Sequence, residues 1–191
     1  MSKSKENILL CARNVFLQEG FSHFSMRKVA SCAGMSATAL YRHYTNKEEL
    51  LFQVLLRGYR IFSQYLEKVN DDQDPLVCLE ESVMAYLKFA LAEKPYYEMM
   101  FMTNDQMTGL DKLNIDGAAE TRHSFELLQQ RVQRAIDTKQ MVSDDSYIAS
   151  FGLWAFAHGQ TSLFLSGRTE VSRKKFVEVY RDLMKAHIHR M

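Results

Sequence analysis

Proline and glycine are scarce in this sequence, with two and eight copies in 191 residues, so few positions interrupt regular secondary structure. The strict alternation of apolar and polar residues that marks half-buried strands is absent throughout. The three cysteines, Cys11, Cys32 and Cys78, form no CxxC pair and suggest no disulfide framework. These absences predict an all-α protein in a reducing compartment, which we expect to be the cytoplasm. We expect Cys11 and Cys32 to pack as small apolar residues, with a redox pair between them as the alternative.

Sequence signatures of common enzyme classes are missing as well. We find no phosphate-binding loop, no nucleophile motif and no HExxH pair of histidines. His187 and His189 are two positions apart, which points them to different faces of a helix. The sequence therefore predicts no catalytic residues, no metal site and no cofactor.

Charged side chains are absent from residues 146–167, counting histidine as neutral, and a stretch of this length could cross a membrane. Five polar residues inside it argue against that role: Ser150, His158, Gln160, Thr161 and Ser162. Small residues on one side of the expected helix would allow close packing against another helix: Gly152, Ala155, Gly159 and Ser162. We therefore expect a buried helix at a subunit interface, and no membrane partner. No signal peptide is expected either, because Lys3, Lys5 and Glu6 interrupt the N-terminal stretch.

The net charge of +1 conceals an asymmetry along the chain. Residues 1–60 hold nine Lys or Arg and four Glu, a net of +5, which leaves 15 basic and 19 acidic residues, a net of −4, for residues 61–191. A basic N-terminal part suits the binding of phosphates, and the acidic remainder suits another task.

Residues 25–50 predict two short helices joined by a tight turn, and then the start of a third helix. Ser25 and Ser36 can each cap a helix by accepting a backbone hydrogen bond. Gly34 stands where a helix-ending residue needs a positive φ, and Asn46 with Glu49 resembles a capping box. Two helices joined by so short a turn form a helix-turn-helix, whose second helix can enter a major groove of DNA.

These residues resemble the DNA-binding domain of the TetR family of transcriptional regulators. The likeness extends from about Asn7 to Leu55. Its matched positions are Ala12, Phe16, Gly20, Phe21, Val29, Ala30, Gly34, Leu40, Tyr41, Tyr44, Lys47, Glu48, Glu49 and Leu50. The resemblance implies a three-helix DNA-binding domain over residues 1–50 and a helical effector-binding and dimerisation domain over residues 51–191. A helical hairpin that never touches DNA is the alternative.

The resemblance also implies which residues contact DNA: Arg27, Lys28, Ser36, Ala37, Thr38, Tyr41, Arg42, His43, Tyr44 and Lys47. Arg27, Thr38 and Arg42 would approach base edges, together with Ala37, because arginine suits guanine and the Thr38 methyl suits thymine. We expect Tyr41, His43, Tyr44 and Lys47 near phosphates, because phosphate contacts fix the position of the domain without reading sequence.

Several of these residues have a plainer interpretation. Tyr41 and Tyr44 could be packing residues, and His43 could simply lie on the surface. Arg27 and Lys28 could form solvated ion pairs. Because Ala37 offers no side-chain hydrogen bond and an arginine at 42 is not a fixed family feature, the base assignments stay open.

Apolar spacing predicts further helices along the chain. A first helix should run from Lys3 to Glu19 and end at Gly20, and a long one from Lys47 to about Val69. Asp74 and Pro75 should begin the next helix, which stops before Pro95. A short apolar segment, 95–102, and a loose polar stretch, Thr103 to Asn114, precede helices over about 117–137, 146–167 and 173–189.

The C-terminal part offers aromatic and methionine side chains for an apolar effector. The candidate lining residues are Phe62, Tyr65, Tyr86, Phe89, Tyr97, Met100, Phe101, Phe125, Phe151, Trp154 and His158. Trp154, His158 and Gly159 resemble the Trp-His-Gly motif of one group of TetR C-terminal domains, and Pro95 to Phe101 resembles the same group. Each of these residues could equally be ordinary core.

The leading hypothesis is a ligand-responsive, homodimeric repressor that binds a palindromic operator and leaves it when a small, mainly apolar effector binds. The homodimer would form through the helices at about 146–167 and 173–189. The alternatives are an activator, or a helical adaptor that binds a protein partner without a small-molecule effector. An enzyme is the least supported hypothesis.

Overall fold

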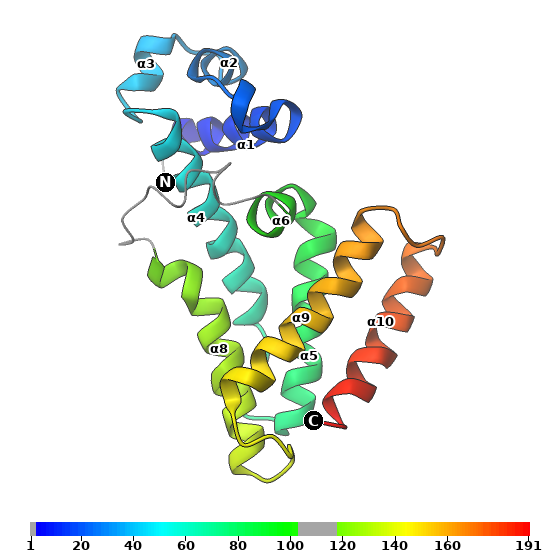
Figure 1. Cartoon of the computed structure of the whole chain (residues 1–191). Coiled ribbons are helices and arrows are strands. Elements are labelled where there is room, and N and C mark those ends of the chain that lie inside the picture. Colours follow the sequence, from blue (N-terminus) through cyan, green and yellow to red (C-terminus); the bar gives the residue numbers. More distant parts are fainter. Residues whose placement is uncertain (1–2, 103–117) are drawn as a thin grey trace. The chain divides into compact units, whose positions relative to one another are not determined.

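Every regular element in the described part of the computed structural model, residues 3–102 and 118–191, is a helix (Figure 1). This confirms the predicted all-α class. The stretch expected to be loose, Thr103 to Asn114, lies outside the described residues. Within those residues, no helix combines the length and the hydropathy that a membrane crossing requires.

The chain divides into two compact units. Unit 1 comprises Met1–Arg60 and Glu93–Ala119, and unit 2 comprises Ile61–Ala92 and Glu120–Met191. Helix α4 (Lys47–Leu66) begins in unit 1 and continues into unit 2. It ends at Leu66 rather than at the predicted Val69, because the residues after Leu66 turn, although Val69 remains buried.

Unit 1 contains α1 (Lys3–His23), α2 (Met26–Cys32), α3 (Ala37–Tyr41), the first part of α4, and α6 (Lys94–Phe101). Helix α1 contacts α2 and α6, and α2 contacts α3. As predicted, Gly20 breaks α1 with a φ of 69°, and the helix resumes as far as His23. The core of this unit includes the predicted apolar stripe and its partners: Ile8, Ala12, Val15, Phe16, Val29, Ala30 and Leu40.

Helix α6 packs with unit 1, although the family resemblance predicts a C-terminal domain that begins at residue 51 and includes this segment. The Arg13 guanidinium lies over the Tyr96 ring at 4.8 Å from its centroid. On α4, Gly58 allows α6 to approach closely, because a Cβ there would lie 2.7 Å from Met100 Sδ and 3.1 Å from Tyr96 Cδ1. Helix–helix contacts of this kind depend on tertiary packing, which local patterning does not encode.

Unit 2 is built around α5 (Pro75–Ala92), which contacts α9 (Ser146–Leu165) and α10 (Arg173–Ile188), and these two helices contact each other (Figure 1). Helix α8 (Ala118–Asp137) contributes Val132 and Ala135 to the buried side chains. The fully buried Tyr180 donates its hydroxyl to the carbonyl of Val83 at 3.0 Å and so ties α10 to α5.

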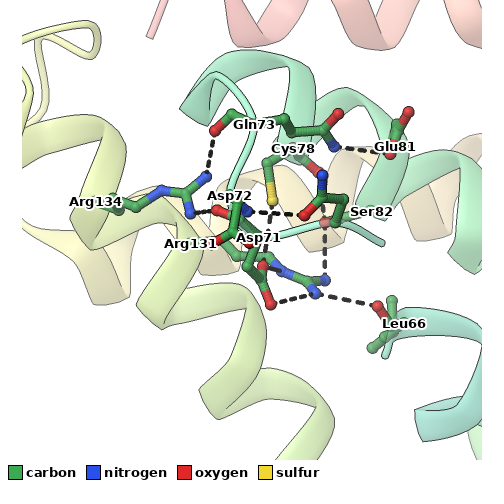
Figure 2. A network of polar contacts seen from close by, with 10 residues as sticks. Leu66, Asp71, Asp72, Gln73, Cys78, Glu81, Ser82, Arg131 and Arg134 are labelled. Atoms are coloured by element: carbon green, nitrogen blue, oxygen red, sulfur yellow. Dashed lines mark hydrogen bonds and ion pairs between the residues drawn. The ribbon is translucent and has the colours of Figure 1, made fainter. Parts of the chain in front are cut away.

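Arg131 of α8 holds the segment that follows α4 (Figure 2). Its guanidinium donates to both carboxylate oxygens of Asp71, at 2.7 and 3.3 Å, to the Leu66 carbonyl at 3.1 Å, and to the Ser82 hydroxyl at 3.0 Å. Arg134, one turn away, donates to the backbone carbonyls of Asp71 and Gln73. Although Arg131 is only 3% exposed, its charge is compensated by Asp71, as a buried arginine requires.

Candidate functional site

The helix-turn-helix is held by the caps that the sequence predicts. The Ser25 hydroxyl accepts from the backbone N–H of Lys28 at 3.3 Å, and the Ser36 hydroxyl accepts from that of Ala39 at 3.1 Å. Between the helices, Gly34 adopts a φ of 68°, and the N–H of Met35 donates to the Ala30 carbonyl. These local bonds set where α3 starts relative to α2.

The entry into α4 is capped in the same way. The Asn46 side chain accepts from the N–H of Glu49 at 2.7 Å. The carboxylate of Glu49 reaches back to Thr45, whose N–H and hydroxyl both donate to it at 2.6 Å, rather than to Asn46. The capping box is therefore present with its return bond shifted by one residue.

Most of the predicted DNA-contacting residues lie on the surface of unit 1. Arg27, Lys28, Ser36, Thr38, Tyr41, Arg42 and His43 are exposed, and Ala37 and Lys47 are half-buried. Within α3 only Leu40 is buried, and it anchors the helix to the core. Helix α3 and the two residues after it thus present polar and basic side chains beside the exposed cations of α2, an arrangement that can meet bases and phosphates together.

Two of the predicted DNA-contacting residues, Tyr44 and Lys28, also make contacts within unit 1. Tyr44 is only 6% exposed, and burial raises the pKa of its hydroxyl, so its ring is a packing residue. The Lys28 ammonium lies 2.7 Å from the Glu19 carboxylate, in the surface ion pair that the sequence left open as an alternative. The Lys28 side chain is still 47% exposed beside Glu19, and contact of either residue with DNA stays a prediction.

Cys11 and Cys32 are joined by a disulfide between α1 and α2, with their Cα atoms 5.7 Å apart. The expectation that both pack merely as small apolar residues is therefore wrong. Only the redox alternative anticipated the pairing. Two cysteines in separate helices carry no spacing signal, so only the packing of α1 against α2 brings them together.

Eight of the eleven candidate effector residues lie in unit 2 and are linked by ring contacts. The Phe62 ring contacts Tyr86 and Phe89, with centroids 5.6 and 4.9 Å apart, and Tyr65 contacts Phe89 at 5.8 Å. Further along, Trp154 contacts Phe125, Phe151 and His158 at 6.0–6.3 Å. We call these eight residues the aromatic cluster: Phe62, Tyr65, Tyr86, Phe89, Phe125, Phe151, Trp154 and His158.

His158 joins the two halves of the aromatic cluster. Its Nδ1 lies 3.0 Å from the Tyr86 hydroxyl, within hydrogen-bond distance. Burial lowers the pKa of the imidazole, so the ring is neutral near pH 7. A neutral histidine paired with a tyrosine is a polar point in otherwise apolar surroundings, and can orient a ligand that is mostly hydrocarbon.

The other three candidates, Tyr97, Met100 and Phe101, belong to α6 in unit 1. Tyr97 is fully buried, and Phe101 contacts both Tyr97 and Tyr59, at 5.5 and 6.3 Å. The structure therefore does not gather all eleven residues in one unit. Tyr97 and Met100 belong to the buried core of unit 1, and the half-buried Phe101 packs beside them.

Helices α9 and α10 each expose an apolar side. On α9 the exposed residues Ile148, Phe151, Gly152, Ala155 and Leu163 follow helical spacing, and a Cβ added to Gly152 or Gly159 would meet nothing within 4 Å. On α10, Val179 and Leu183 are exposed. Apolar side chains exposed at regular helical spacing can pack against a further helix.

Comparison with protein families gives two matches that together cover most of the chain. The profile described as "Bacterial regulatory proteins, tetR family" matches residues 8–54. The profile described as "Tetracyclin repressor-like, C-terminal domain" matches residues 79–189. Membership of the C-terminal domain in the Trp-His-Gly group stays a prediction.

Individual relatives agree with these matches over nearly the whole length. An HTH-type transcriptional regulator of Staphylococcus aureus (strain USA300) is 23% identical over 181 residues, which are 94% of each chain. Among solved structures, the fatty acid degradation regulator FadR from Bacillus halodurans has a TM-score of 0.79 at 14% identity, covering 96% of this chain and 95% of that one. AibR in complex with isovaleryl coenzyme A and operator DNA has a TM-score of 0.75 at 18% identity, covering 99% and 100%.

Proposed function

Because the chain belongs to the TetR family of bacterial regulatory proteins and is a transcriptional regulator, we propose that it acts as a ligand-responsive, homodimeric repressor in the cytoplasm. The observation that carries this proposal is the capped helix-turn-helix, in which α3 buries Leu40 and exposes Thr38, and its C-cap Arg42 is exposed as well. The basic charge of residues 1–60 supports the same role, since phosphate contacts supply much of the affinity for DNA.

Two such units in a dimer would bind a palindromic operator. A two-fold axis in the protein matches a two-fold axis in the DNA when the recognition helices are about 34–36 Å apart, or a multiple of that. The exposed apolar sides of α9 and α10 support dimerisation through these helices, and the small residues of α9 would allow close approach.

The dimer is tested by placing like charges at the expected contact. We expect Ala155→Glu to give a monomer in analytical ultracentrifugation, because each exposed Ala155 would bring its new carboxylate against the partner's α9. Val142→Glu is the matched control, since Val142 is 91% exposed and lies outside these helices. A dimer that survives Ala155→Glu unchanged contradicts this interface.

The operator can be found by selecting bound duplexes from a pool of genomic fragments, followed by footprinting. We expect a symmetric site and a steep loss of affinity with salt. Arg42→Ala should weaken specific binding about tenfold or more if Arg42 reads a base. Arg168→Ala removes the same charge from an exposed position of unit 2 and should leave binding unchanged. Equal binding to all duplexes would defeat the proposal of a sequence-specific repressor.

For the effector, we propose a molecule with a short or medium acyl chain. The aromatic cluster supports an apolar chain, and the His158–Tyr86 pair supports a carbonyl or carboxyl group at one end. The similar proteins FadR and AibR, one a fatty acid degradation regulator and the other bound to isovaleryl coenzyme A, support the same class. The net −4 of residues 61–191 favours a free acid over a polyanionic thioester, so both forms should be tried.

Trp154 is the only tryptophan, and its contacts with His158 and Phe125 make it a reporter inside the aromatic cluster. Titration with acyl chains of increasing length should change its fluorescence. Tyr86→Phe should weaken binding of the acyl ligand, because it removes the hydroxyl beside His158. Tyr147→Phe removes a hydroxyl from an exposed residue and should leave binding unchanged. The absence of any fluorescence or calorimetric response across the series would count against an acyl effector in this cluster.

Release from DNA requires that the effector bind the DNA-incompetent state more tightly. Helix α4 supports such coupling, because it is one continuous helix whose residues belong to both units. The effector should therefore lower operator affinity, and the operator should lower effector affinity by the same factor. A reporter gene that is activated rather than repressed would favour the activator, and capture of a protein partner with no DNA binding would favour the adaptor.

A further inference from the structure

The disulfide between Cys11 and Cys32 is a feature that neither DNA recognition nor effector binding explains. It joins the middle of α1 to the last residue of α2, with a Cα–Cα distance in the ordinary range for disulfides. The third cysteine, Cys78, is a buried free thiol in unit 2. Unit 1 therefore holds a cysteine pair of its own, and Cys32 lies just before the turn of the helix-turn-helix.

The two cysteines differ in exposure. Cys11 is 6% exposed within the core of unit 1, whereas Cys32 is exposed at the end of α2. A thiol or a peroxide from solution can therefore reach Cys32, while Cys11 stays covered. An exposed partner of this kind is what distinguishes accessible disulfides from those sealed inside a core.

The cross-link fixes the turn that leads to α3. Cys32 immediately precedes Ala33 and Gly34, and the Asn7 side chain donates to the Ala33 carbonyl at 3.2 Å. Asn7 and Cys11 lie one turn apart on α1, so a single face of α1 holds this turn at two points. Helix α3 has five residues, too few to be stable alone, so its position depends on this turn together with the buried Leu40.

We propose that Cys11 and Cys32 form a reversible dithiol–disulfide site, and that the disulfide state is the form with higher DNA affinity. The reason is preorganisation. Both redox forms keep the Asn7 bond and the backbone bonds of the turn, such as that from the Met35 N–H to the Ala30 carbonyl. Only the disulfide form also ties the end of α2 covalently to α1 before DNA arrives, so the start of α3 has less freedom to move. The effect on DNA rests on the function proposed above, whereas the thiol chemistry does not.

Hydrogen peroxide can form this disulfide, and a dithiol can reduce it. Hydrogen peroxide oxidises the Cys32 thiol to a sulfenic acid and releases one water. The Cys11 thiol then attacks this sulfur, and the sulfenic hydroxyl leaves as the second water when the disulfide forms. Reduction by a dithiol begins with thiolate attack on Cys32 Sγ, which releases Cys11. The second thiol of the reductant then releases Cys32 and leaves the reductant as a cyclic disulfide, with two electrons and two protons transferred.

Thiol counting on the full-length protein tests the site without any DNA. After treatment with hydrogen peroxide, alkylation under denaturing conditions should label one cysteine, Cys78, and after reduction by dithiothreitol under native conditions it should label three. The disulfide form should melt about 5–10 °C higher, since it closes a loop across a sequence separation of 21. Failure to form the disulfide in the native protein, or failure to reduce it without denaturant, overturns the proposal.

DNA affinity is then compared between the two forms on a random-sequence duplex and on the selected operator. The disulfide form should bind the operator at least about fivefold more tightly. Cys32→Ser should bind as the reduced protein does, and peroxide should no longer change its affinity. Cys78→Ser is the matched control and should keep the full response.

The outcomes separate the two proposals. Equal operator affinity of the two redox forms overturns redox control of DNA binding. No binding to any duplex by either form, with normal thiol chemistry, is a failure of the proposed repressor function instead. Cys11→Ala provides a second variant in which the buried position stays apolar, so that a folding defect in one variant does not decide the test.

Discussion

Replacing Arg131 by methionine should lower the free energy of unfolding by about 2–4 kcal/mol. The substitution keeps most of the side-chain volume, so little of this cost comes from a cavity. It removes the donors to Leu66, Asp71 and Ser82, which then have to find other partners.

The largest loss should be at the Leu66 carbonyl, which is held at the buried end of α4 and accepts from a charged donor, an interaction of about 1.5–3 kcal/mol. Ser82 loses less, because its hydroxyl still donates to the Cys78 carbonyl at 2.7 Å. Asp71 is 53% exposed, so water replaces much of the guanidinium, and we assign it at most about 1 kcal/mol.

The assay is urea unfolding followed by circular dichroism, with a fall in Tm of about 4–16 °C as a second readout. Arg122→Met is the matched control, because this arginine of the same helix has 65% of its side chain exposed, and should change stability by less than about 0.5 kcal/mol. Arg131→Lys should recover only part of the loss, since an ammonium cannot reproduce the forked contact with Asp71.

The effect of Arg131→Met on stability should depend on pH. Hydrogen bonding and charge from Arg131 lower the pKa of Asp71, so this carboxylate stabilises the fold above its unfolded pKa near 3.8, and the contribution disappears as pH falls through the folded value. The stability gap between wild type and Arg131→Met should therefore narrow below about pH 4. An Arg131→Met protein as stable as wild type at pH 7 would refute the reasoning.

Three further predictions concern single side chains. Ser36→Ala should lower the free energy of unfolding by about 1 kcal/mol and weaken DNA binding, because α3 loses its N-cap. Ser31→Ala, at an exposed position of α2, should change neither, and equal effects of the two substitutions would contradict the role of the cap. Since burial lowers the pKa of His158, protonation favours the unfolded state, so stability should fall as pH drops below about 6.5, and His158→Phe should flatten that dependence when melting is followed against pH. Gly58→Val should destabilise unit 1 by about 1–3 kcal/mol in urea unfolding, because its branched side chain meets Met100 and Tyr96; a stabilised variant would disprove the close approach of α6.

The sequence predicts best what local chemistry determines. Ser25, Ser36 and Asp74 cap helices where expected, because a cap needs only its own side chain and the next two or three backbone N–H groups. Gly20 and Gly34 adopt the positive φ that their positions call for. The all-α class follows from the same local patterns, and for the helix-turn-helix the family resemblance added what periodicity alone could not supply.

Long-range packing accounts for what the sequence did not predict. The position of α6 depends on Arg13 and Gly58, which lie far from it in the chain, and neither residue type signals a partner. The Cys11–Cys32 bond has the same origin. For the candidate effector residues, apolar type alone could not separate Tyr97, in the core of unit 1, from Tyr86, which lies beside His158.

The discontinuous make-up of unit 1 has a consequence during synthesis. The chain completes α1 to Arg60, then makes the whole of α5, and only then makes α6, which supplies the partners of Arg13 and Gly58. At ordinary ribosomal rates, synthesis from Arg60 to Phe101 takes about 2–8 s. During this time the helix-turn-helix exists without α6, which packs against α1 in the finished unit 1. A nascent chain or a gene fusion that ends at residue 60 would carry every residue proposed to touch DNA and still lack part of the core that steadies them.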